Sequence, residues 1–197
     1  MIGKFQISLA SYQLPFGAGQ RFASGASGWV DKLIGGWQWN GIFYIQSGFP
    51  FTPLIGSNTP GTGDSSQSDV PNLALANPLC NGKVILGTDG FKKTGLYFNP
   101  NCFSIPPAGT FGNVSRGSFT GPVLANVDTS LFKKLSINEK YSLQFRAEVF
   151  NLLNHANFQD PTQIVFNGSS ISGTAGAITT TNTATSRQIQ FALKLIF

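Results

Sequence analysis

Few side chains in this sequence have the types and spacing that covalent chemistry needs. His155 is the single histidine, and because no nucleophile motif lies near it in the sequence, we expect it to have a structural role at a strand end. Arg146 and Glu148 are two residues apart, which in a strand places both side chains on one face. There they could pair with each other or contact another part of the protein. We therefore predict no catalytic site, and we expect that the protein is not an enzyme and has no cofactor.

The two cysteines, Cys80 and Cys102, both lie in one long polar segment. An even pair in a loop favours a disulfide in an oxidising compartment. Such a bond would stabilise the loop by roughly 3 kcal/mol in the chain-entropy model. The alternative is two unrelated free thiols. Metal binding is not expected, because no further Cys or His stands at ligand spacing.

The composition is unusual for a protein surrounded by water. Charged residues make up 11% of the 197 residues and hydrophobic residues 41%, whereas soluble domains carry about 25% charged residues. Part of the surface is therefore expected to face something other than water. The net charge is +5, but most basic residues stand singly and no nucleic-acid-binding motif accompanies them, so nucleic acid is not an expected partner. No apolar stretch reaches about 18 residues, which excludes a transmembrane helix but not a membrane β-barrel.

Apolar and polar residues alternate with a period of two in several segments, which is typical of strands. The alternation predicts strands at residues 4–14, 37–46, 124–137, 141–153 and 187–197. A short helix is expected at 28–34, where Trp29, Leu33 and Ile34 would share one side and two glycines follow. The last strand is the clearest, because every second residue from Ile189 to Phe197 is apolar. In the third strand Lys133 interrupts the apolar face, which either a bulge near Phe132 or a position at the edge of a membrane could explain.

Trp37 and Trp39 stand at one end of the apolar face of the second strand. In a membrane barrel they would belong to the interfacial girdle of aromatic residues. The alternative is a pair of core tryptophans in a soluble β-sandwich.

The connections between the strands differ greatly in length. A three-residue turn, Asn138 to Lys140, contrasts with long polar segments at 50–121 and 154–186, and such a contrast is typical of outer-membrane barrels. The predicted fold is thus an all-β, antiparallel transmembrane β-barrel segment of about five strands, with long extracellular loops that we expect to be disordered. An open sheet in lipid exposes unpaired backbone groups, so further strands should lie upstream. We infer that Met1 is not the biological start and that residues 1–197 are the C-terminal part of a barrel.

Several stretches resemble TonB-dependent receptors, especially those that carry a carboxypeptidase-regulatory-like domain. The matching pieces lie at residues 12–17, 35–38, 46–51, 98–100, 109–121 and 145–155, and the last of these is the most specific. The C-terminal strand also resembles the signal that the barrel-assembly machinery reads, with Ala192 standing where glycine is usual. The signal residues are Gln190, Ala192, Leu195 and Phe197.

This resemblance implies a C-terminal fragment of a receptor in the cell outer membrane that takes up a bulky solute with energy supplied through TonB. The whole barrel would have about 22 strands and a plug, and Arg146 and Glu148 would face its lumen. The implied partners are outer-membrane lipid, the barrel-assembly machinery, and the upstream strands and plug; TonB would be contacted only through the N-terminal part, which this chain lacks. The alternatives are another outer-membrane barrel, such as a porin or adhesin, or a secreted glycan-binding β-sandwich.

Overall fold

The computed structural model describes residues 4–63, 69–182 and 186–197, so Met1 lies outside the described residues. The chain divides into two compact units. The first, here called the sheet unit, consists of Phe5–Ile45, Ala125–Ala156 and Ala184–Phe197. The second, here called the lobe, consists of Met1–Lys4, Gln46–Leu124 and Asn157–Thr183. No helix in the described part of the chain is long and apolar enough to span a membrane.

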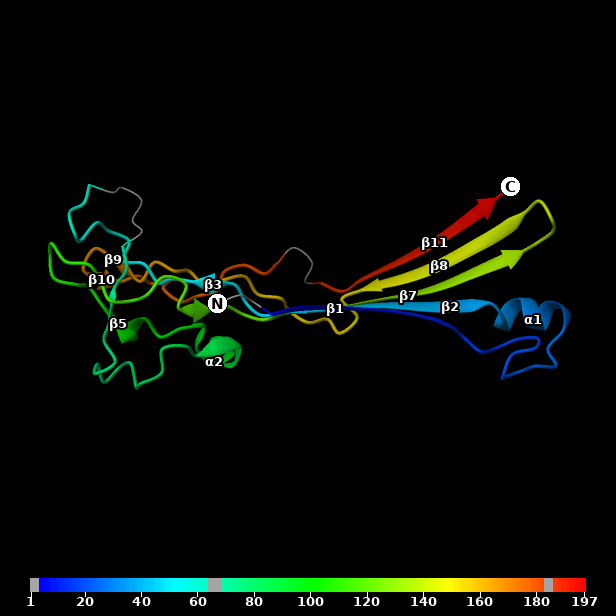
Figure 1. Cartoon of the computed structure of the whole chain (residues 1–197), viewed down its shortest axis with the longest axis horizontal. Coiled ribbons are helices and arrows are strands. Elements are labelled where there is room, and N and C mark those ends of the chain that lie inside the picture. Colours follow the sequence, from blue (N-terminus) through cyan, green and yellow to red (C-terminus); the bar gives the residue numbers. More distant parts are fainter. Residues whose placement is uncertain (1–3, 64–68, 183–185) are drawn as a thin grey trace. The chain divides into compact units, whose positions relative to one another are not determined.

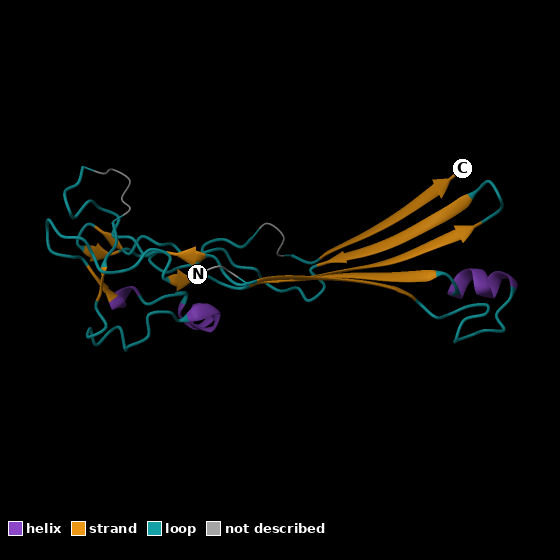
Figure 2. Ribbon diagram, in the orientation of Figure 1, coloured by secondary structure: helices purple, strands orange, loops and turns teal. Residues whose placement is uncertain are grey.

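The sheet unit is built on a five-stranded sheet with the order β1-β2-β7-β8-β11 (Figure 1). The strands are β1 (Phe5–Gln13), β2 (Trp37–Gln46), β7 (Leu124–Ser136), β8 (Ser142–Phe150) and β11 (Gln188–Ile196). The sheet is open, with β1 and β11 at its edges (Figure 2). The predicted all-β fold and all five predicted strands are confirmed, because alternation over nine or more residues is a strong local signal.

The register of the last three strands creates one apolar and one polar face. Ala147 of β8 lies between Leu131 of β7 and Phe191 of β11 on one side of the sheet. On the other side Arg146 lies between Phe132 and Ala192. The pairing of β7 with β8 continues without a break from Thr129 to Ser136. The bulge considered near Phe132 is therefore wrong, and Phe132 belongs to the polar face.

The apolar residues of β1 lie on the polar face of the sheet. The side-chain amide of Gln38 donates to the hydroxyl of Ser11 at 2.9 Å, and the rings of Phe5 and Tyr44 are 5.4 Å apart. Odd-numbered residues of β1 thus share a face with even-numbered residues of β2, which is the polar side of that strand. The exposed apolar side chains that β1 places there are Phe5, Ile7 and Leu9.

Two connections lie at one end of the sheet, a longer one between β1 and β2 and a short turn between β7 and β8. Helix α1 (Gly28–Ile34) precedes β2, at the bounds that the sequence predicts. The turn between β7 and β8 is closed by Asn138, whose side-chain oxygen accepts from the backbone N–H groups of Lys140 at 3.0 Å and Tyr141 at 2.7 Å. Asparagine is favoured in turns because its side chain bonds the backbone two residues on.

The lobe contains short elements joined by ordered loops. Three antiparallel pairs of two-residue strands are present: β3 (Pro50–Phe51) with β6 (Phe119–Thr120), β4 (Asn72–Leu73) with β5 (Phe103–Ser104), and β9 (Phe166–Asn167) with β10 (Ser170–Ile171). The helices are α2 (Gly87–Thr94) and a 3-10 helix, η1 (Pro100–Cys102). The close approach of two backbones requires glycine at one point, since a Cβ on Gly48 would collide with the carbonyl group of Gly121.

The lobe has a hydrophobic core of its own. Phe98 and Val165 are completely buried, and the ring of Phe98 lies 5.9 Å from that of Phe51 and 5.7 Å from that of Phe103. The expectation of disordered long loops is therefore wrong for the described residues. The apolar side chains of these segments stand far apart in the sequence and show no periodicity, so their common burial is visible only in the folded chain.

Candidate functional site

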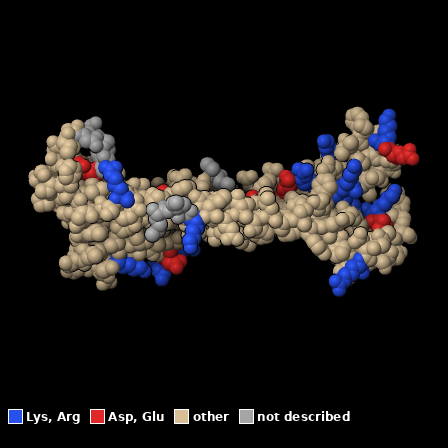
Figure 3. Space-filling model, in the orientation of Figure 1, with Lys and Arg blue, Asp and Glu red and all other residues tan. Residues whose placement is uncertain are grey.

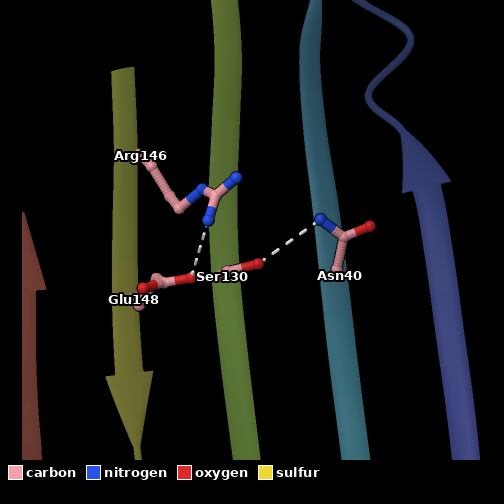
Figure 4. A network of polar contacts seen from close by, with 4 residues as sticks. All are labelled: Asn40, Ser130, Arg146 and Glu148. Carbon is pink, nitrogen blue, oxygen red and sulfur yellow. Dashed lines mark hydrogen bonds and ion pairs between the residues drawn. The ribbon is translucent and has the colours of Figure 1, made fainter. Parts of the chain in front are cut away.

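A row of polar side chains crosses three strands on the polar face of the sheet (Figure 4). Asn40 of β2 donates from its side-chain amide to the hydroxyl of Ser130 on β7 at 3.3 Å. On β8, Nη1 of Arg146 lies 3.6 Å from Oε1 of Glu148. The guanidinium group of Arg146 also lies over the ring of Phe132, 5.9 Å from its centroid. The two residues that the sequence places on one face thus form an ion pair.

This polar row is suited to noncovalent binding. The side chains of Arg146 and Glu148 are 48% and 29% exposed, so their ion pair contributes only about 0–1 kcal/mol to stability. Their donors and acceptors therefore remain available to another polar surface or to a solute.

Residues 146–155 include the end of β8 and the turn that follows it, and side-chain hydrogen bonds hold this turn in place. The side chain of Asn151 is buried and pairs with the backbone of His155 in both directions, at 2.9 and 3.0 Å. The backbone N–H of Asn151 donates to the carboxylate of Asp128 at 2.8 Å. Asn154 accepts from the backbone N–H of Arg187 at 3.3 Å. These contacts connect the end of β8 to β7 and to the segment that precedes β11. Asn151 and Asn154 both have positive φ angles.

The tryptophans lie on the apolar face, next to Lys133. The indole N–H of Trp39 donates to the hydroxyl of Thr129 at 2.6 Å. Trp37 stacks edge-on against Phe145, with centroids 6.0 Å apart. The amine of Lys133 lies over the ring of Trp37, 5.0 Å from its centroid, and donates to backbone carbonyls at the end of α1. Lys133 therefore reaches the edge of the apolar face, where its charge is satisfied.

Cys80 and Cys102 form a disulfide in the lobe. The side-chain amide of Asn99 donates to the carbonyl oxygens of Leu79 and Cys80 at 2.9 and 3.1 Å. The side chain of Asn99 also accepts from the backbone N–H of Asn101 and thereby caps the start of η1, which begins at Pro100. Sequence reasoning did not single out Asn99, although it lies in a stretch that resembles the receptors.

A pocket of about 290 Å³ in the lobe is lined by Phe49, Pro122, Leu124, Phe158, Gln159, Asp160 and Asn182. Burial raises the pKa of the Asp160 carboxyl above its ordinary value. Burial, together with the nearby charge of Asp160, also raises the pKa of Tyr97. The hydroxyl of Tyr97 donates to the carbonyl of Thr120 at 3.0 Å. Sequence reasoning missed these residues, because no local pattern brings them together.

The four residues of the expected assembly signal lie in the edge strand β11 or directly after it. Gln190 and Ala192 are opposite Glu148 and Arg146 on the polar face. Leu195 lies on the apolar face, and Phe197 is 85% exposed beyond the end of the strand.

Comparisons with known proteins give one family. Neither curated proteins nor solved structures yield a match. A family model described as an outer membrane beta barrel domain matches residues 4–190. In such barrels residues that face lipid alternate with residues that face the lumen, and short turns lie on the periplasmic side. The two faces of the sheet agree with this alternation, and the soluble β-sandwich alternative is wrong. The chain belongs to the outer membrane β-barrel domain family and is located in the cell outer membrane.

Proposed function

We propose that this chain is the C-terminal part of a TonB-dependent receptor, which takes up a bulky solute across the outer membrane through a plugged barrel. Five described strands make an open sheet, and β1 and β11 each have one strand neighbour within it. Each unpaired backbone group in lipid costs several kcal/mol. Both edges are therefore expected to pair with further strands, as in a large barrel.

In this proposal the polar face of the sheet borders the barrel lumen and the apolar face meets lipid. The observation that carries the proposal is an apolar patch on that polar face. Phe5, Ile7 and Leu9 of β1 are 59%, 51% and 76% exposed, and Ile42 of β2 is 47% exposed. A water-filled porin channel has a polar interior, whereas apolar side chains lining a lumen are stabilised by covering protein. A plug domain of the same polypeptide would supply that cover.

The polar row fits the same proposal. Arg146, Glu148, Ser130 and Asn40 offer donors and acceptors beside the apolar patch. A plug that packs on the patch would bind these groups at its rim, as polar groups do at protein interfaces. The resemblance of residues 145–155 to the receptors supports this function independently.

Conductance separates a plugged receptor from a porin. The whole protein would be inserted into planar bilayers in potassium chloride, and its binding to the purified C-terminal domain of TonB would be measured. We expect a closed barrel that conducts only after urea treatment, and saturable binding of TonB.

Two outcomes would contradict the proposal. A steady open conductance in the absence of urea would indicate a porin. A closed barrel that does not bind TonB would indicate a plugged barrel with another function.

The proposal includes recognition of β11 by the barrel-assembly machinery. The exposed edge of this strand and its terminal Phe197 suit pairing with another strand. Assembly should therefore slow when Phe197 is replaced by Ala, as measured by the appearance of the heat-modifiable form in cells. An unchanged rate would contradict this part.

A further inference from the structure

We propose that α1 is an interfacial anchor that inserts Trp29, Val30 and Leu33 into the periplasmic phospholipid leaflet beside the barrel. This inference does not depend on the TonB-dependent function. It rests on the two sides of the helix, on its attachment to the lipid-facing side of the sheet, and on the charges around it.

The helix has one unpartnered apolar side. Trp29, Val30 and Leu33 are 80%, 59% and 73% exposed, and their spacing places them on one side of the helix. Asp31, on the opposite side, accepts from the backbone N–H of Ala18 at 2.5 Å. The helix thus lies against its own link through the polar side and leaves the apolar side open.

The end of α1 is attached to the lipid-facing side of the sheet. The amine of Lys133 donates to the carbonyl oxygens of Leu33 at 2.9 Å and Gly35 at 2.5 Å. The indole N–H of Trp37 donates to the same carbonyl of Leu33 at 3.1 Å. Because a helix C-terminus carries partial negative charge, the Lys133 amine is favourable there. The C-terminal end of α1 is therefore held beside Trp37 and Lys133, at the end of the apolar face of the sheet.

The surroundings have the charge that a phospholipid surface attracts. Figure 3 shows Lys and Arg side chains gathered at the end of the sheet where α1 lies. Lys32 lies over the ring of Trp29, 5.4 Å from its centroid. Interfacial helices combine an aromatic residue on the apolar side with basic residues that meet anionic lipid. Since β2 begins directly after α1, the helix lies at the same end as the short 138–140 turn, which is periplasmic.

Spin labels report where the apolar side lies. Val30→Cys would be labelled in the whole protein, reconstituted in bilayers of phosphatidylethanolamine and phosphatidylglycerol. Ser24→Cys, at an exposed position in the same link, is the matched control. Leu33→Cys provides a second label on the apolar side if one variant fails to give the heat-modifiable folded form.

We expect the labels at Val30 and Leu33 to collide more with oxygen, which concentrates in the bilayer, than with a water-soluble nickel chelate. The label at Ser24 should show the reverse preference. Preference for the nickel chelate at Val30 and Leu33 would overturn the proposal, because the helix would then lie in water. Shielding from both reagents would also overturn it, because another protein segment would cover the helix.

Discussion

The lobe and the sheet unit place their apolar side chains in opposite ways. In the lobe, Phe98 and Val165 are completely buried, whereas Phe191 and Leu193 on the apolar face of the sheet are 73% and 67% exposed. Burial of apolar surface is the main favourable term in folding. The lobe therefore obtains that term from its own core, whereas in the proposed barrel the sheet would obtain it from lipid. Changes to the core should affect the lobe alone, and changes to the lipid face should affect the sheet.

The largest effect is expected from Phe98→Ala. Loss of a completely buried phenylalanine leaves a cavity and should lower the free energy of unfolding of the lobe by about 3–5 kcal/mol. Pulse proteolysis in urea, on protein held in bilayers, measures this loss. Phe191→Ala is the control, because its side chain is exposed on the sheet and lies outside the core of the lobe. Equal losses of lobe stability in both variants would contradict the separation of the two regions.

Removal of the disulfide should destabilise the lobe slightly less. Cys80 and Cys102 are 22 residues apart, and opening such a loop costs about 3 kcal/mol in the chain-entropy model. The double variant Cys80→Ser with Cys102→Ser should become sensitive to protease at lower urea, whereas its folded barrel should still migrate as the heat-modifiable form. Loss of that form would mean that the sheet depends on the lobe.

A charge on the lipid face tests the other half of the comparison. Leu131 and Ser130 are adjacent in β7 but lie on opposite faces. Leu131→Arg should destabilise the barrel in bilayers by about 2–4 kcal/mol if the residue lies near the bilayer centre. Ser130→Arg should have little effect, because it faces the lumen opposite Glu148. Unfolding by guanidinium of the protein in lipid vesicles measures the loss of stability in both variants. A larger loss for Ser130→Arg than for Leu131→Arg would mean that the two faces are assigned the wrong way round.

The smallest effect is expected from the charge of Asp160. Because burial raises the pKa of Asp160 in the folded lobe, its contribution to stability is fully present below the ordinary pKa of about 3.8. That contribution is lost as the pH rises through the raised pKa. Asp160→Asn should abolish this loss, so that the variant is more stable than the native lobe near neutral pH. Pulse proteolysis at several pH values measures the stability of the lobe in both proteins. If stability changed with pH in the same way in the native protein and in the variant, the prediction would be contradicted.

The sequence by itself determined the strands and their order along the chain. Alternation predicts β2 at its observed bounds, and β1, β7, β8 and β11 to within three residues at each end. Helical spacing of apolar residues predicts α1 at its observed bounds. A spacing of two residues also puts Arg146 and Glu148 on one face. These features are local, because a strand repeats every two residues wherever it lies in the molecule.

Only the tertiary structure decided which face meets which surroundings and what the long loops do. Alternation separates Phe5, Ile7 and Leu9 from their neighbours, but cross-strand contacts with β2 place them on the polar face of the sheet. The amine of Lys133 donates to a backbone carbonyl of helix α1, which lies about 100 residues earlier in the sequence. The core around Phe98 joins two separate parts of the sequence, residues 51–119 and 158–178. Contacts between distant residues leave no periodic trace in a sequence, so folding alone reveals them.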